Sequence, residues 1–206
     1  MASKVIMFGG ASSKYPLPPI EEGSERWCIN NLCLTPDGAL RTKHATHWFD
    51  LHHKEWIVSP RPQGRGSLGL WQRYQRSKIP VFMWQHHDDV PMSVAYEVDE
   101  IRAMFGGTRL FCSTLDWLLA RALWKGFEEI DLYGWRMGQF NYMHQVHSAD
   151  WWLKQCVDRG VKITHWSPTA LQKIVRAVEF KPPRPDSTHL MYGLETTDRA
   201  LLYHGR

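Results

Sequence analysis

The most constraining feature of the sequence is the segment CSTLDWLLARALWKGFEEIDLYG, residues 112–134. Ser113 or Thr114 is a suitable helix N-cap, and leucines and alanines recur after it at spacings of three and four. Gly126 is placed to end the helix, and the segment EEIDLYG after it predicts a strand over residues 128–134. A helix joined by a tight turn to a buried strand is the repeating unit of an α/β fold.

Other apolar runs of strand length lie on both sides of this unit. They predict strands at residues 4–8, 26–34, 45–53, 79–86 and 161–167, with a short helix within 93–106 and another helix at 148–160 between them. Because most of these runs are apolar throughout, each strand is expected to be covered on both faces. The sequence therefore predicts an α/β, Rossmann-like domain with a mostly parallel sheet and helices on both faces.

The chain of 206 residues suits one such domain. We expect a nucleotide-binding unit over residues 1–180, with a mobile loop rich in Pro, Gly and Arg at 58–75 and a peripheral tail at 181–206. The four cysteines show no CxxC spacing, which favours free thiols and a cytoplasmic location. No segment has the ~18 apolar residues of a membrane span, so no membrane partner is expected.

Glycine and polar residues gather immediately after the predicted strands. In a parallel sheet the carboxyl ends of the strands share one edge, where ligands of such folds bind. The first loop, GGASS, combines glycines with hydroxyls, which suits contacts to phosphate, and a plain turn is the alternative. The residues expected along this edge are Gly9, Gly10, Ser12, Ser13, Asn30, Asn31, Asp50, His52, His53, His86, Asp88, Ser113, Thr114, Gly134, Trp135 and Arg136.

Metal binding and nucleic-acid binding are alternatives to this nucleotide hypothesis. Asp50 and His52, with His86 and Asp88, could form a mixed nitrogen and oxygen site, but their spacing matches no zinc motif and we expect no metal. The net charge of +4 is a mild basic excess, compatible with a phosphorylated ligand or with DNA. The loop arginines Arg61 and Arg65 could contact phosphates, and the nearby Trp71 and Tyr74 could stack on bases; a solvated basic loop is the alternative.

The order of motifs resembles a small Rossmann-like group. FGGASS, CINN, WFDLHH, the ST…GFEEIDLYG segment and QVHSADWW follow one another as in the small bacterial sialyltransferases and the motility accessory factor proteins, which include uncharacterised phage-encoded relatives. The similarity covers about residues 4–172 and is greatest over 112–137. It implies a glycosyltransferase that uses a cytidine nucleotide sugar as donor and needs no metal.

The resemblance also implies roles for individual residues. The glycine loop would contact phosphate, and the residues after the second and third strands and the Ser-Thr pair would contact the nucleotide. The implied residues are Gly10, Ser12, Ser13, Asn31, Asp50, Ser113, Thr114 and Gly134, to which we add the adjoining Gly9, Asn30 and His52. A histidine before the next helix would be the base, with His147 preferred over His144 because it lies nearer the helix start.

Two departures from the group's pattern keep other functions open. Arg136 stands where relatives carry an acidic residue, and it could stabilise the departing phosphate or mark a loss of catalysis. The loop reads GGASS where relatives often have GxGPS. The alternatives are a kinase or pyrophosphokinase-like enzyme that requires Mg²⁺, and a non-catalytic nucleotide- or DNA-binding protein. A phage-encoded enzyme of this group could also act on a modified nucleic-acid base.

Overall fold

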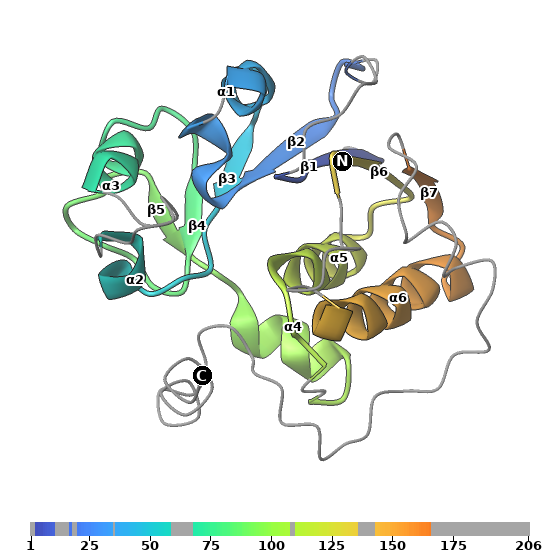
Figure 1. Ribbon diagram of the computed structural model, residues 1–206. Coiled ribbons are helices and arrows are strands. Elements are labelled where there is room, and N and C mark those ends of the chain that lie inside the picture. The colour runs from blue at the N-terminus through green and yellow to red at the C-terminus, as the bar shows by residue number, and fades with distance from the viewer. Residues whose placement is uncertain are drawn as a thin grey trace.

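The computed structural model describes residues 3–10, 17, 20–34, 36–58, 68–107, 110–135 and 143–165. Seven strands, all parallel to their neighbours, form one sheet in the order β5-β4-β3-β2-β1-β6-β7 (Figure 1). The strands are β1 (Lys4–Phe8), β2 (Glu25–Ile29), β3 (His47–Phe49), β4 (Val81–Met83), β5 (Ser93–Ala95), β6 (Glu129–Tyr133) and β7 (Lys162–His165). The predicted α/β, Rossmann-like class is confirmed.

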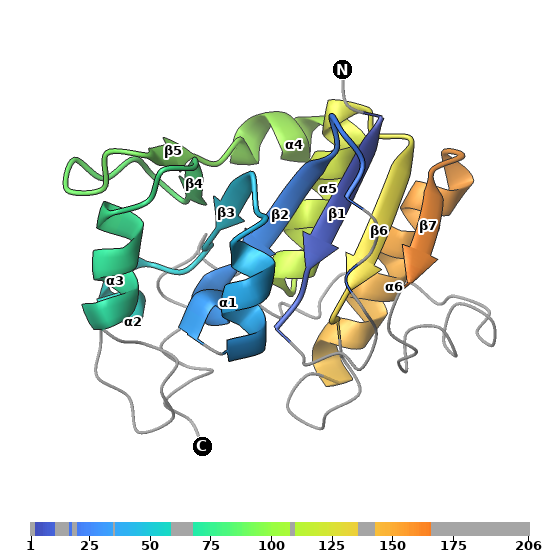
Figure 2. The ribbon, with the colours of Figure 1, turned by 90° about the horizontal axis from the view of Figure 1, so that it is seen from above.

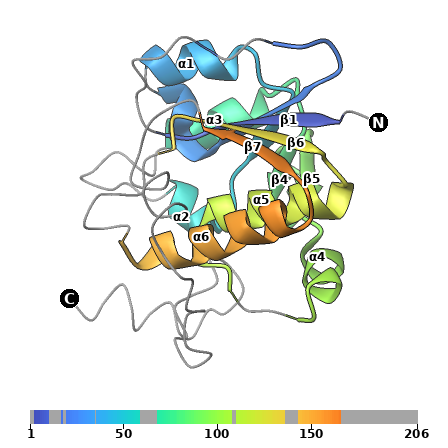
Figure 3. The same ribbon diagram turned by 90° about the vertical axis from the view of Figure 1, so that its right-hand side faces the viewer.

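Helices cover both faces of this sheet. Helix α1 lies in front of the strands in Figure 2, whereas α5 and α6 lie behind them, and Figure 3 shows the same separation from the side. The helices are η1 (Asn30–Leu34), α1 (Pro36–Thr42), α2 (Lys54–Val58), α3 (Leu68–Gln75), α4 (Val98–Met104), α5 (Thr114–Lys125) and α6 (Met143–Asp158). No helix among the described residues is long and apolar enough to cross a bilayer.

Strand β1 shows why a central strand is apolar on both of its faces after its first residue, Lys4. Val5 and Met7 join the core cluster that contains the buried residues of α5 and α6, and Ile6 and Phe8 join the cluster on the opposite face. All four side chains are at most 1% exposed. Successive residues of a strand point to opposite faces, so a strand covered by helices on both sides buries apolar side chains on both.

Helix α5 forms as its local signals predict. Ser113 is the N-cap and shares a capping box with Asp116, and Gly126 ends the helix in the left-handed conformation at φ 76°. Its residues from Thr114 to Leu123 are all buried, because the helix lies against the sheet on one side and against α6 on another. A helix surrounded in this way is apolar over most of its circumference.

Several boundaries differ from those predicted. The second strand ends at Ile29 rather than residue 34, because Asn30 adopts φ 44° and turns the chain into η1. The short helix predicted within 93–106 is confirmed as α4, which ends before Gly106, and the same segment also contains the unpredicted strand β5. Residues 68–75, assigned to a loop, form α3, and residues 59–67 and 166–206 lie outside the described part of the chain.

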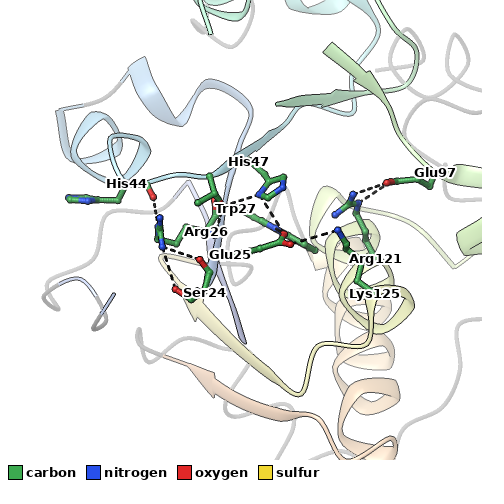
Figure 4. A network of polar contacts seen from close by, with 10 residues as sticks. Ser24, Glu25, Arg26, Trp27, His44, His47, Glu97, Arg121 and Lys125 are labelled. Carbon is green, nitrogen blue, oxygen red and sulfur yellow. Dashed lines mark hydrogen bonds and ion pairs between the residues drawn. The ribbon is translucent and has the colours of Figure 1, made fainter. Parts of the chain in front are cut away.

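A charged network lies near the amino ends of β2 and β3, where Glu25 and His47 begin these strands (Figure 4). Arg121 of α5, 2% exposed, donates from Nε and Nη2 to the carboxylate of Glu97 at 2.9 and 2.7 Å. Its guanidinium also lies 4.3 Å from the centre of the Phe82 ring. The network ties α5 to the segment before α4 and lies away from the carboxyl ends of β2 and β3.

Candidate functional site

The topology places most of the predicted site residues along one edge of the sheet. Strands β2 and β6 flank β1, so the direction of winding changes at β1 and the carboxyl ends of these strands form the switch point of the fold. Gly9, Asn30, Asp50 and Gly134 directly follow β1, β2, β3 and β6. Since neighbouring strands lie about 4.8 Å apart, the end of β3 is about 10 Å from the end of β1.

Four predicted residues cannot be placed in this arrangement. Ser12, Ser13 and Arg136 lie outside the described residues. His144 belongs to α6, but its side chain is outside the description. Their assigned roles stay predictions.

The switch point is closed by a tight contact between β1 and the residues after β6. A Cβ atom added to Gly9 would lie 2.6 Å from the backbone oxygen of Gly134 and 2.7 Å from the ring of Trp135. The indole Nε1 of Trp135 donates to the backbone oxygen of Met7 at 2.9 Å. Glycine is therefore required at position 9 by the approach of Trp135, whereas Gly10 is exposed and has nothing within 4 Å of an added Cβ.

A buried arginine that the sequence analysis missed lies beside this point. Arg41 of α1 is 1% exposed, and its Nη1 donates to the backbone oxygen of Gly9 at 2.6 Å. Its guanidinium lies 5.7 Å from the centre of the Tyr133 ring. A fixed positive charge next to the loop that follows β1 favours the binding of an anionic ligand at that loop. Helix α1 has no apolar periodicity in PDGALRT, so no signal pointed to this residue.

The carbonyl of Asn30 joins the ends of β2 and β3. Asn30 is the one described non-glycine residue with a positive φ, 44°, a conformation often found at functional sites. Its backbone oxygen accepts a hydrogen bond from Nε1 of Trp48 at 3.0 Å and lies 3.2 Å from the hydroxyl of Tyr74. Asn31 follows within η1 and is half-buried.

Asp50 lies at the centre of a hydrogen-bonded cluster at the end of β3. Its side chain is buried, Oδ1 is 2.6 Å from Nδ1 of His52, and Oδ2 accepts from the Tyr74 hydroxyl at 2.5 Å. The His52 ring stacks on Trp56, with centroids 5.5 Å apart and planes at 16°. Burial, together with the charge of Asp50, raises the pKa of Tyr74 well above its usual range, so Tyr74 remains a phenol that can donate.

The predicted Ser113-Thr114 pair begins α5 and is buried. Ser113 is 4% exposed and Thr114 is 8% exposed. Asp116, also buried, accepts at Oδ2 from the backbone N–H of Cys112 at 2.7 Å, from that of Ser113 at 2.9 Å and from the hydroxyl of Ser148 at 2.8 Å. Burial raises the pKa of Asp116 to about 7 against the opposing effect of these hydrogen bonds. The Ser113 side chain serves as a helix cap here.

His147 lies close to this junction of helices. Ser148, the next residue, joins the start of α6 to the start of α5 through its bond to Asp116. The His147 side chain is exposed. Burial raises the pKa of Asp150, and the nearby His147 opposes this effect in part. The predicted base is therefore accessible from solvent beside the N-terminus of α5.

The stacking role suggested for Trp71 and Tyr74 is wrong. These side chains are 3% and 0% exposed and belong to the core cluster on the α3 side of the sheet. Arg61 and Arg65 lie outside the described residues. Within the described ranges, no group of three or more His, Cys, Asp or Glu side chains is arranged to hold a metal ion; His86 and Asp88 contact each other at 3.5 Å and are exposed.

Comparison with known proteins identifies the fold. No protein-family model and no curated sequence matches the chain. The structure is similar to that of the sialyltransferase CstII from Campylobacter jejuni in complex with cytidine-5'-monophosphate, with a TM-score of 0.52 and 12% identity over 98% of this chain and 99% of that one. Structures of CstII with CMP-3FNeuAc, and with a trisaccharide acceptor and CMP, give TM-scores of 0.51 at 13% identity, covering 94% of this chain and 91% of theirs. The resemblance to sialyltransferases is thus confirmed at the level of the fold.

Proposed function

We propose that this chain is a nucleotide-sugar-dependent glycosyltransferase that binds its donor at the carboxyl edge of the sheet. The observation that carries the proposal is the convergence of Gly9, Asn30, Asp50 and Gly134 on one edge, in a fold shared with CstII. CstII binds CMP, and it has been solved with CMP-3FNeuAc and with a trisaccharide acceptor, which supports a donor of this class.

The phosphate of the donor would lie at the switch point. The exposed backbone of Gly10 lies there, just after β1. The buried guanidinium of Arg41 donates to the carbonyl of the preceding residue, Gly9, and brings a positive charge next to this loop. Negative charge grows on this phosphate as its bond to the sugar breaks, and preorganised positive groups stabilise that charge. Arg136, predicted to act on the same phosphate, would add to this field.

Transfer to an acceptor hydroxyl also needs a base. A histidine suits this step because its usual pKa lies close to neutrality. The resemblance assigns the step to His147 or His144, and His52 is a third histidine after a strand of the same sheet. In this proposal no metal is required, which separates it from a kinase or pyrophosphokinase-like reaction.

Ligand-induced stabilisation of the full chain tests the proposal. Unfolding temperature is measured with CMP, CMP-sugars and the corresponding uridine and guanosine compounds, and with duplex DNA as a separate arm. A cytidine nucleotide at 100 times its Kd is expected to add ~2.7 kcal/mol of stability. Release of CMP from a CMP-sugar, with and without EDTA, then shows whether turnover occurs without a divalent metal. If no nucleotide or nucleotide sugar raises the unfolding temperature, the proposal is overturned.

A further inference from the structure

Three side chains after β3 and on α3 form a continuous chain of hydrogen bonds. Tyr74 donates to Oδ2 of Asp50 at 2.5 Å, and Oδ1 of Asp50 lies 2.6 Å from Nδ1 of His52 and 3.2 Å from the His52 backbone N–H. Tyr74 and Asp50 are 0% and 1% exposed, whereas the His52 side chain keeps 16% of its surface. The chain therefore runs from the core to an accessible imidazole.

This arrangement fixes both the tautomer and the plane of the His52 ring. A carboxylate can only accept hydrogen bonds, so the contact with Asp50 places the hydrogen of a neutral imidazole on Nδ1. The lone pair is then on Nε2, which is directed away from Asp50. Stacking of the His52 ring on Trp56 restrains the orientation of the imidazole plane. A carboxylate behind a histidine also stabilises the imidazolium that forms when Nε2 takes a proton.

The buried carboxylate itself is poorly placed to contact a ligand. Asp50 is 1% exposed and already accepts from Tyr74 and twice from His52. Its negative charge would also repel a donor phosphate at close range. Any action of Asp50 on a ligand therefore passes through His52.

The position of His52 suits an acceptor rather than the donor phosphate. It follows β3, two strands from β1, which is about 10 Å along the edge from the switch point. The anomeric carbon is bonded to a phosphate oxygen, so the acceptor hydroxyl, and the base that contacts it, lie on the far side of that carbon from the phosphate. His147 is exposed but lies within α6, which begins at Met143 and not at residue 148 as predicted, whereas His52 has an oriented ring with a carboxylate behind it.

We propose that His52 is the base of the transfer reaction, with Asp50 and Tyr74 as positioning residues; this rests on the proposed glycosyltransferase function. Nε2 of His52 removes the proton from the acceptor hydroxyl, whose oxygen forms the new bond to the anomeric carbon of the sugar. The bond from that carbon to the phosphate oxygen breaks, and its electron pair leaves with the nucleoside monophosphate. The imidazolium then returns its proton to water.

The test compares full-length variants in a transfer assay with CMP-NeuAc as donor and the trisaccharide acceptor of CstII. His52→Gln is expected to lower kcat by 10²- to 10⁴-fold while the donor KM changes less than threefold, because the base acts only in the transition state. His44→Gln is the matched control, since the His44 ring points away from its neighbours near the amino ends of the strands (Figure 4), and it is expected to leave kcat unchanged.

Two further readouts separate catalysis from a structural role. Added imidazole is expected to restore part of the activity of His52→Ala, which it would not do for a residue that only supports the fold. A low-field Nδ1 proton signal is expected by NMR in the unmodified protein and is expected to shift in Asp50→Asn and, more weakly, in Tyr74→Phe. This signal also tests the geometry if the His52 variants fail to fold.

The outcomes distinguish the two proposals. Full transfer activity in His52→Gln, or loss of activity in His147→Gln with activity kept in His52→Gln, would overturn the role of His52 and leave the glycosyltransferase function standing. A rise in donor KM with unchanged kcat would make His52 a nucleotide-binding residue instead. An unmodified protein that turns over no nucleotide sugar would overturn both proposals.

Discussion

Replacing Asp116 with Asn should remove a strong pH dependence of stability. The Asp116 carboxyl is fully buried at the start of α5; Oδ2 accepts three hydrogen bonds, and Oδ1 has no hydrogen-bond partner among the described residues. A helix N-terminus favours the anion by at most about 2 kcal/mol. Burial outweighs that preference and raises the pKa to about 7. The neutral acid is therefore the stable form below neutral pH.

The size and sign of the effect follow from proton linkage. The unfolded chain loses this proton near the ordinary pKa of 3.8, and the folded protein keeps it up to about pH 7. Between these values the folded state holds one more proton than the unfolded state, so the free energy of unfolding falls as pH rises. At 1.36 kcal/mol per pH unit, the loss attributable to Asp116 reaches about 4 kcal/mol by pH 7 to 8.

Urea denaturation at intervals from pH 4 to pH 8 measures this loss. Asp116→Asn keeps an acceptor for the three donors but cannot ionise, so its stability relative to the unmodified protein should rise by about 4 kcal/mol across that range. Any constant cost of the substitution cancels in this comparison. A difference that stays flat, or that falls as pH rises, would mean that the anion caps the helix and would refute the argument from burial.

Two other substitutions test the packing described above. Gly9→Ala should lower the free energy of unfolding by about 1–3 kcal/mol, because its Cβ would lie 2.7 Å from the Trp135 ring; Gly10→Ala, with nothing within 4 Å, should stay within about 0.5 kcal/mol in the same denaturation assay. Glu97→Gln should cost about 3 kcal/mol by leaving the buried Arg121 guanidinium without its carboxylate (Figure 4). Equal stability of Glu97→Gln and the unmodified protein at pH 7 would show that the pair contributes nothing.

Local signals explain which elements were predictable. Helix α5 carries its start and stop within its own sequence, at Ser113 and Gly126. Strand β1 contains four consecutive apolar residues, and in β6 apolar residues alternate with acidic ones before Tyr133. Strand β5 has three residues, two of them exposed, which is too short for a hydrophobic pattern typical of a strand. Helix α3 follows directly on a run of Pro, Gly and Arg that reads as a loop.

The candidate site was predictable only as a set of positions. The topological rule brings Gly9, Asp50 and Gly134 to one edge, because it depends on strand order and not on side chains. The partners of these positions come from elements that the sequence does not mark. Tyr74 lies 24 residues from Asp50, on α3. Arg41 reaches Gly9 across 32 residues. Pairings over such separations depend on tertiary packing.

The place of β1 between β2 and β6 has a consequence for synthesis of the chain on the ribosome. One side of β1 can pair with β2 as soon as residue 29 has emerged, but its other side waits for β6, which begins at residue 129. At translation rates of 5–20 residues per second, that delay is roughly 5–20 seconds. During it the nascent protein exposes an apolar strand with an open hydrogen-bonding edge, which makes early chaperone contact advantageous and truncated products prone to aggregate.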